Sequence, residues 1–294
     1  MARNASYSYD HIKNLRGGKD MRLLYRETYY VCGDYLISHI YPVFKMQTSR
    51  GKKAKPTSET QQKLNEMKAK DHILRKANAS FVHGYDIKLD LTFKRNPVDY
   101  DEAWNTVRNF LRRVKRFRNR KGLPELRYIA VIETGSLKGR YHAHMIISGG
   151  LSNEELEKLW GYGYISASPL RFDESGLAGL VNYMMKQGRT MPGRKKYLCS
   201  NNLIDPNKRQ RDGFLSNYKV KELGDPENRA DFEKLHPGYC LSESKTLFND
   251  STGGLYLYTT YYNKEAAFCK KKTSNRLLYS DGRSSPKGNT LNSL

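Results

Sequence analysis

The sequence predicts an α+β fold in which helices cover a central antiparallel sheet. Residues 85–188 alternate apolar and polar positions in some stretches and repeat apolar positions at helical spacing in others. The expected order is strand, helix, strand, strand, helix, strand, helix, which is typical of an antiparallel sheet packed against helices. The chain has 294 residues, of which 38% are hydrophobic, so it can form a substantial core.

Each element follows from its local pattern. Leu89, Leu91 and Phe93 alternate with polar residues and predict a half-buried strand. A helix is expected over about 100–120, where acidic residues stand at the start and apolar residues recur at helical spacing. The later elements expected in this part of the chain are strands at 126–133 and 140–148, a short helix at about 152–160, a strand beginning at 161–165 and a helix over about 173–188.

The sequence divides into four predicted parts. Tyr-rich residues 23–45 indicate short strands or a packed cap, and a polar helix is expected from a capping box at Ser58 and Gln61 to about Ala77. An aromatic run at 255–262 indicates a further strand. The four parts are an N-terminal extension at 1–80, a core domain at 81–190, a C-terminal extension at 191–270 and a basic, disordered tail at 271–294.

The charge of the chain favours a polyanionic partner. Lys and Arg number 52 against 30 acidic residues, giving a net charge of +22, and nucleic acid is the usual partner of such a protein. The 22 tyrosines and 10 phenylalanines offer flat surfaces for unpaired bases, although the tyrosines could instead fill the core.

Several classes of protein are not expected. No apolar run approaches the ~18 residues of a membrane span, and the first residues carry no apolar segment of a signal peptide. The 4 cysteines form no Cys-x-x-Cys pair, which argues against a structural zinc site and a disulfide framework. We therefore expect a cytoplasmic protein with no membrane partner.

A His-x-His sequence, His142-Ala-His144, lies in one of the expected strands. Because side chains alternate along a strand, both imidazoles face the same way, with Cα atoms ~6.6 Å apart. Two imidazoles at that spacing can share one metal ion. The alternative is two surface histidines on a polar face.

Glu133 is the expected third metal ligand, because it ends the preceding strand. It must then share the face of the two histidines, and the number of residues in the turn decides this. An odd-numbered turn puts Glu133 opposite Tyr141, on the wrong face, whereas an even-numbered turn or a bulge puts it opposite His142. We predict the even register. In the alternative, Glu133 only pairs with Lys138 or Arg140.

The helix expected over 173–188 carries Tyr183 and, one turn further on the same side, Lys186. A tyrosine hydroxyl, with a pKa near ~10, needs a metal or a cation to act as a nucleophile, and Lys186 is placed to supply the cation. Gly176 and Gly179 lie in the turn beneath Tyr183, where missing side chains would let a phosphate backbone approach. The alternative is an ordinary tyrosine beside the core stripe.

Taken in order, the carboxylate, the His-x-His strand and the helical Tyr-x-x-Lys resemble the HUH endonucleases, specifically the rolling-circle replication initiators. Flanking segments also resemble replication-associated proteins of filamentous phages and Firmicutes plasmids. The resemblance covers about 85–205, and Ala143 is a mild departure where the family has a bulkier hydrophobe. The matching segments are Leu89-Asp-Leu-Thr-Phe93, His142-Ala-His144, Tyr183-Met-Met-Lys186, Leu159-Trp-Gly-Tyr-Gly-Tyr-Ile165 and Lys196-Tyr-Leu-Cys-Ser-Asn-Asn-Leu203.

The resemblance implies an HUH or RRM-like (ferredoxin-like) sheet and a metal-dependent DNA nickase and strand transferase. Mg²⁺ or Mn²⁺ would lie on Glu133, His142 and His144 and polarise a scissile phosphate. Tyr183 would attack, leaving a 5′-phosphotyrosine and a free 3′-hydroxyl that primes synthesis, while Lys186 stabilises charge. Because no Gly-x-x-x-x-Gly-Lys-[Ser/Thr] is present, the expected partners are origin DNA, single-stranded or hairpin, with a helicase and a polymerase of the bacterial host.

Two basic runs fit a DNA partner. The run at 186–211 follows the Tyr183 helix directly, whereas the run at 108–121 could be only a solvated helix face. The residues expected to contact DNA near the site are Arg189, Arg194, Lys195 and Lys196. The alternative functions are an HUH relaxase or transposase and a non-catalytic RRM-like nucleic-acid-binding protein, which stacking aromatic residues on the sheet face would favour.

Overall fold

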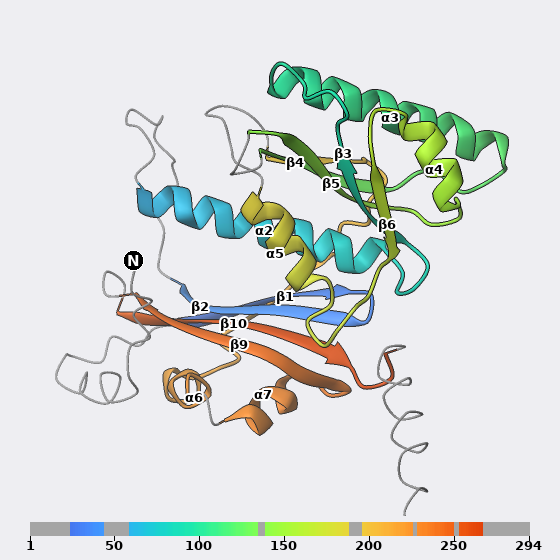
Figure 1. The fold of residues 1–294 in the computed structure, drawn as a ribbon. Coiled ribbons are helices and arrows are strands. Elements are labelled where there is room, and N and C mark those ends of the chain that lie inside the picture. Colours follow the sequence, from blue (N-terminus) through green and yellow to red (C-terminus); the bar gives the residue numbers. More distant parts are fainter. Residues whose placement is uncertain are drawn as a thin grey trace, which may run out of the picture.

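Two antiparallel five-stranded sheets lie one above the other, with helices between them and on both outer sides (Figure 1). The computed structural model describes residues 24–43, 59–134, 139–187, 196–225, 228–249 and 253–266. The predicted α+β class, an antiparallel sheet covered by helices, is confirmed.

The sheet that carries the histidines, called here the central sheet, has the strand order β6–β3–β5–β4–β7. Its strands are β3 (Ile87–Thr92), β4 (Tyr128–Thr134), β5 (Tyr141–Ile147), β6 (Ile165–Pro169) and β7 (Leu198–Cys199). The histidine strand β5 is therefore the middle strand. Helices pack on both faces of the sheet, which explains why β5 is buried from Ala143 to Ile147.

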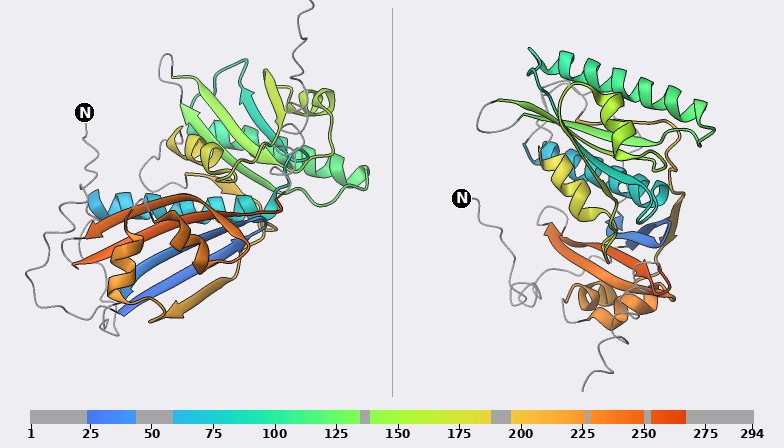
Figure 2. Two further views of the ribbon diagram at one scale, coloured as in Figure 1. Left: turned by 90° about the horizontal axis from the view of Figure 1, so that it is seen from below. Right: turned by 45° about the vertical axis from the view of Figure 1, so that its right-hand side comes forward.

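One face of the central sheet packs against α3 (Tyr100–Arg120) and α4 (Asn153–Trp160) (Figure 2). The Asp99 carboxylate caps α3 by accepting a hydrogen bond from the backbone N of Glu102 at 2.8 Å. Ser152 and Glu155 form a capping box at the start of α4. Both helices thus span the residues expected from their apolar spacing and their acidic first turns.

The opposite face of the central sheet packs against α2 (Glu59–Ser80) and α5 (Ala178–Gln187), which lie between the two sheets (Figure 1). Ile73 of α2 and Val181 and Met184 of α5 share one core with Ile146 of β5. The same core includes Ile37 of the other sheet, so α2 and α5 join the two sheets through buried apolar contact.

Helix α5 begins at Ala178, later than predicted, because the residues just before it form a tight turn. The backbones of Asp173 and Gly176 bond to each other, and Gly176 has a φ of +69°. A Cβ at Gly176 would lie 2.6 Å from Oδ1 of Asn78, so an α2 side chain occupies the space that we expected to be open to a phosphate. Gly179 differs, because a Cβ there would meet nothing within 4 Å.

The other sheet, called here the second sheet, has the order β8–β1–β2–β10–β9 and combines strands from both ends of the described chain. Its strands are β1 (Leu24–Cys32), β2 (Tyr35–Val43), β8 (Lys208–Asp212), β9 (Tyr239–Asn249) and β10 (Gly254–Asn263). Its outer face carries α6 (Asn217–Leu223) and α7 (Arg229–Leu235) (Figure 2). The domain boundaries stay a prediction, and both the predicted tail and Ser58 lie outside the described residues.

A buried charged cluster holds β1, β2, β8 and the end of α7 together. The Glu27 side chain is fully buried, and its carboxylate accepts hydrogen bonds from Ser38 Oγ and Arg211 Nε, each at 2.7 Å. His236 Nε2 lies 2.8 Å from the same carboxylate. Burial raises the pKa of Glu27, but the hydrogen bonds from His236 and Ser38 and the Arg211 charge outweigh burial and lower that pKa overall.

Candidate active site

Strand β5 presents His142 and His144 on the face of the central sheet that carries α5. The residues between and after them, Ala143 and Met145, point into the core beneath α3 on the other face. His144 is 7% exposed and His142 is half-buried. The strand therefore directs both imidazoles to one side, as the alternation predicts.

The pairing of β4 with β5 brings Glu133 to the same face. Glu133 lies opposite His142 in the register, and Thr134 lies opposite Tyr141. The predicted even register is thereby confirmed, and the Glu133 side chain shares the histidine face.

His144 is held between two carboxylates. Its Nε2 lies 2.7 Å from Glu133 Oε2, and its Nδ1 lies 2.6 Å from Asp90 Oδ1. Burial lowers the pKa of His144, but the hydrogen bonds to Asp90 and Glu133 outweigh it and raise that pKa overall. Burial likewise raises the pKa of Asp90, whereas His144 and Lys88 lower it overall.

Asp90 is a site residue that the sequence pattern did not identify. The alternation of β3 indicates only that Asp90 faces away from the apolar side of that strand. The structure pairs β3 with β5 and puts Asp90 opposite His144. The sequence signal is an acid at a polar position of the strand, but it does not say which strand is the neighbour.

Helix α5 brings Tyr183 to the histidines. The rings of Tyr183 and His144 meet edge to face, with centroids 5.3 Å apart and an interplanar angle of 76°. Tyr183 is 44% exposed, so its ring contacts the site while remaining accessible from solvent. Lys186 is also exposed and lies three residues further along the same helix.

The donor set fits a divalent metal ion in its chemistry. Among the described residues, no group of three or more His, Cys, Asp and Glu side chains is gathered closely enough to hold a metal. Glu133 and His144 already touch, and the register puts His142 beside Glu133 on the same face. Asp90 on Nδ1 of His144 is the outer contact that commonly orients a metal-binding imidazole, leaving Nε2 to face the ligand position.

The residues predicted to contact DNA are only partly described. Arg189, Arg194 and Lys195 lie outside the described residues. Lys196 forms an ion pair of 2.5 Å with Glu66 of α2, and this contact lowers the pKa of the Glu66 carboxyl. The Lys196 charge is therefore already partnered within the protein.

Comparison with known proteins supports the same part of the chain. Residues 87–188 match a family model for replication-associated proteins of the ORF2 type. That range extends from β3 through α5 and contains Glu133, both histidines, Tyr183 and Lys186. No curated protein and no solved structure matches the chain. This segment is thus similar to replication-associated proteins.

In the part of the chain that the structure describes, no helix is both long and apolar enough to cross a membrane.

Proposed function

We propose that this protein starts rolling-circle DNA replication by nicking and rejoining single-stranded origin DNA. The contact between the Tyr183 and His144 rings carries the proposal, because it joins a nucleophile from a helix to a histidine strand. The family match over 87–188 supports a replication role. A host helicase and polymerase would complete the reaction, in the cytoplasm of a bacterial host cell.

In the proposed reaction, the Tyr183 oxygen attacks the phosphorus of the scissile phosphodiester. The bond from phosphorus to the 3′ oxygen breaks, the 5′ phosphate stays on Tyr183, and the 3′ oxygen leaves with a proton as a hydroxyl. Lys186, one turn along the exposed side of α5, offsets the negative charge that develops near the phenol oxygen. The reverse attack by a 3′-hydroxyl rejoins the strand.

Glu133, His142 and His144 would hold the divalent ion. When bound, Mg²⁺ or Mn²⁺ would supply Lewis-acid polarisation of the scissile phosphate. Glu133 contributes negative charge, and the contact of Asp90 with Nδ1 keeps the His144 ring turned so that Nε2 faces Glu133. The protein's own contribution is thus to orient the ligands beside Tyr183.

The sheet face favours an enzyme over a binding module. In the described strands β3, β4 and β5, the side chains on this face are Lys88, Asp90, Thr92, Ile129, Val131, Glu133, His142, His144 and Ile146. None of them is Phe, Tyr or Trp, the residues on which an RRM-like sheet stacks bases. The chemical groups present suit phosphate chemistry instead.

A cleavage assay tests the proposal. The protein is incubated with single-stranded oligonucleotides that tile the intergenic DNA beside its gene, in Mn²⁺ or in EDTA. We expect a covalent protein–DNA adduct in a denaturing gel that requires the metal and disappears in Tyr183→Phe. Tyr218→Phe is the matched control, because Tyr218 is 77% exposed on α6 and far in sequence from the site.

Two results would overturn the proposal. An adduct of full yield in Tyr183→Phe would assign the nucleophile to another residue. Binding of oligonucleotides without an adduct, in every oligonucleotide and with both metals, would leave a binding protein only.

A further inference from the structure

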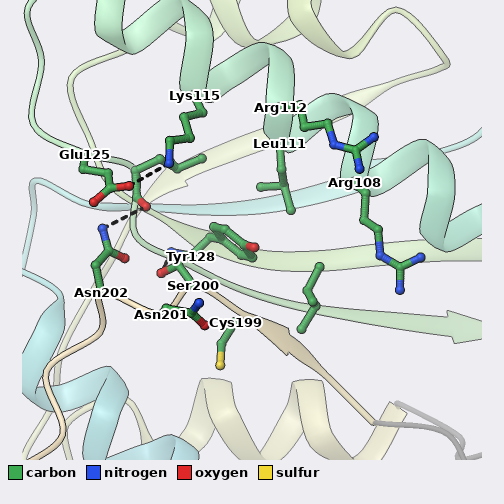
Figure 3. Close-up of a pocket in the computed structure, with 12 residues that line it drawn as sticks. Arg108, Leu111, Arg112, Lys115, Glu125, Tyr128, Cys199, Ser200, Asn201 and Asn202 are labelled. Atoms are coloured by element: carbon green, nitrogen blue, oxygen red, sulfur yellow. Dashed lines mark hydrogen bonds and ion pairs between the residues drawn. The ribbon is translucent and has the colours of Figure 1, made fainter.

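A polar cavity lies on the opposite face of the central sheet from the histidines. It has a volume of about 410 Å³ and opens between α3 and the edge formed by β7 and the residues after it (Figure 3). Tyr128 of β4 lies in it, on the α3 side of the sheet, whereas Glu133 of the same strand faces α5. The cavity therefore shares no residue with the candidate active site.

The α3 wall of the cavity is strongly cationic. Arg108 and Arg112 stand one helical turn apart and are both exposed. Their guanidinium groups donate hydrogen bonds to the neutral side chains of Asn105 at 3.1 Å and Asn109 at 3.0 Å. Because these partners carry no charge, both arginines keep a full positive charge for an anion.

The remaining charges at the rim pair with each other. Lys115 lies 2.7 Å from Glu125, and this ion pair lowers the pKa of the Glu125 carboxyl (Figure 3). The one acidic side chain among the residues that line the cavity is thus neutralised. The net positive charge is concentrated at Arg108 and Arg112.

The rest of the cavity suits a flat heterocycle. The Tyr128 ring, half-buried among apolar side chains of the core, offers a face for stacking. Burial raises the pKa of Tyr128, and the charges of Lys115 and Arg108 oppose this only in part, so the hydroxyl stays a neutral donor. Asn201 and Asn202 follow β7 at the rim, and Asn202 Nδ2 donates to the backbone oxygen of Leu126 at 3.3 Å.

We propose that this cavity binds a nucleotide, with the phosphate on Arg108 and Arg112, the base against Tyr128 and the base edge at the Asn201 and Asn202 amides. Cations, an aromatic face and amides together match a phosphate joined to a base better than a simple anion. The volume lies within the ~300–1,000 Å³ typical of small-ligand sites. The nucleotide can come from single-stranded DNA or from the free pool, and the cleavage chemistry plays no part in this proposal.

The test compares two double variants that each remove two arginines from α3. Arg108→Gln with Arg112→Gln removes the cavity pair. Arg116→Gln with Arg120→Gln removes the same charge from exposed positions that do not line the cavity. Full-length proteins are titrated into a fluorescent oligodeoxythymidylate, and unlabelled thymidine monophosphate and inorganic phosphate are added as competitors. Thermal unfolding checks that both variants fold.

We expect the cavity variant to bind the oligonucleotide about tenfold more weakly than the control variant does, which is the usual scale of one or two lost contacts. Its salt dependence should also become shallower by ~1.4 in the slope of log K against log salt, for two lost phosphate contacts on a single strand. A loss confined to thymidine monophosphate would support the cavity with a free nucleotide as its ligand.

A cross-link reports on the cavity itself. An oligonucleotide that contains 5-iodouracil is irradiated with the protein, and the cross-linked peptide is identified by mass spectrometry. We expect the peptide that contains Tyr128 to be modified in the control variant and spared in the cavity variant.

Equal binding of both ligands by the two variants, with no cross-link at Tyr128, would overturn the proposal. Competition by inorganic phosphate as strong as that of thymidine monophosphate would reduce the cavity to a general anion site and would also overturn it. Adduct formation by Tyr183 is measured separately, so failure of the cavity and failure of the nickase are distinguishable.

Discussion

The ring of Tyr183 packs edge-on against the ring of His144, with 5.3 Å between their centroids. This contact joins α5 to the middle strand of the central sheet at the position where Glu133 also reaches His144. Placement of α5 depends on buried contacts of Val181 and Met184 with the core between the sheets. The packing of an apolar helix face therefore sets the position of a polar site.

Asp90 is predicted to act as a positioning residue for His144. Asp90→Asn keeps the shape of the side chain but removes the charge that lies 2.6 Å from Nδ1. We expect Mn²⁺ affinity to fall about 10–100-fold, the usual effect of losing an outer partner of a metal-binding imidazole. Isothermal titration with Mn²⁺ measures this directly, without a DNA substrate.

The control for Asp90→Asn is Asp101→Asn, because Asp101 is an exposed residue in the first turn of α3. His142→Ala and His144→Ala set the scale for loss of a direct ligand. Unchanged Mn²⁺ affinity in Asp90→Asn would show that the contact with Nδ1 has no part in metal binding.

Gly176→Ala is predicted to destabilise the protein and to weaken adduct formation. Gly176 has a φ of +69°, and a Cβ would lie 2.6 Å from Asn78 Oδ1, so both backbone and packing oppose the change. We expect a loss of about 1–3 kcal/mol in the free energy of unfolding, measured by urea denaturation. The displaced turn should shift α5 and with it Tyr183.

Gly179→Ala is the matched control for this glycine. A Cβ at Gly179 meets nothing within 4 Å, and the residue is helical, so we expect about 0.4–1 kcal/mol of added stability. Equal stability changes in the two variants would contradict the role assigned to Gly176 in the turn.

Glu27→Gln is predicted to be strongly destabilising. The carboxylate is fully buried with Arg211 and His236, so its removal leaves the Arg211 charge without its buried anion. We expect a loss of about 3–5 kcal/mol in the free energy of unfolding. Glu222→Gln, which breaks the surface pair with Lys219, should cost about 1 kcal/mol or less.

The pH dependence of this cluster has a definite sign. The pKa of Glu27 is lowered in the folded protein from its ordinary value of 4.5. Its contribution to stability is therefore complete above pH 4.5 and is lost as the pH falls through the lower, folded value. Urea titrations at a series of acid pH values should show a shallower decline in Glu27→Gln than in the unmodified protein, and parallel declines would argue against the shift.

Local regularity made part of the site predictable from the sequence. Strand alternation places His142 and His144 on one face whatever the neighbours are, and parity of the turn makes the Glu133 register a choice of two. Helical spacing similarly identifies α3 and puts Tyr183 beside the apolar stripe of α5. These patterns depend only on backbone geometry, which repeats every two or about 3.6 residues.

Only the tertiary structure decided which distant segments become neighbours. Pairing of β3 with β5 makes Asp90 a partner of His144, and the packing of α3 over β7 brings Arg108 to Tyr128 and Asn201. Strands from the two ends of the described chain likewise meet in the second sheet. The sequence by itself determined the faces of the strands and helices, because these follow from local geometry. Strand order and helix packing result from the burial of apolar surface between residues far apart in the chain, which no local period encodes.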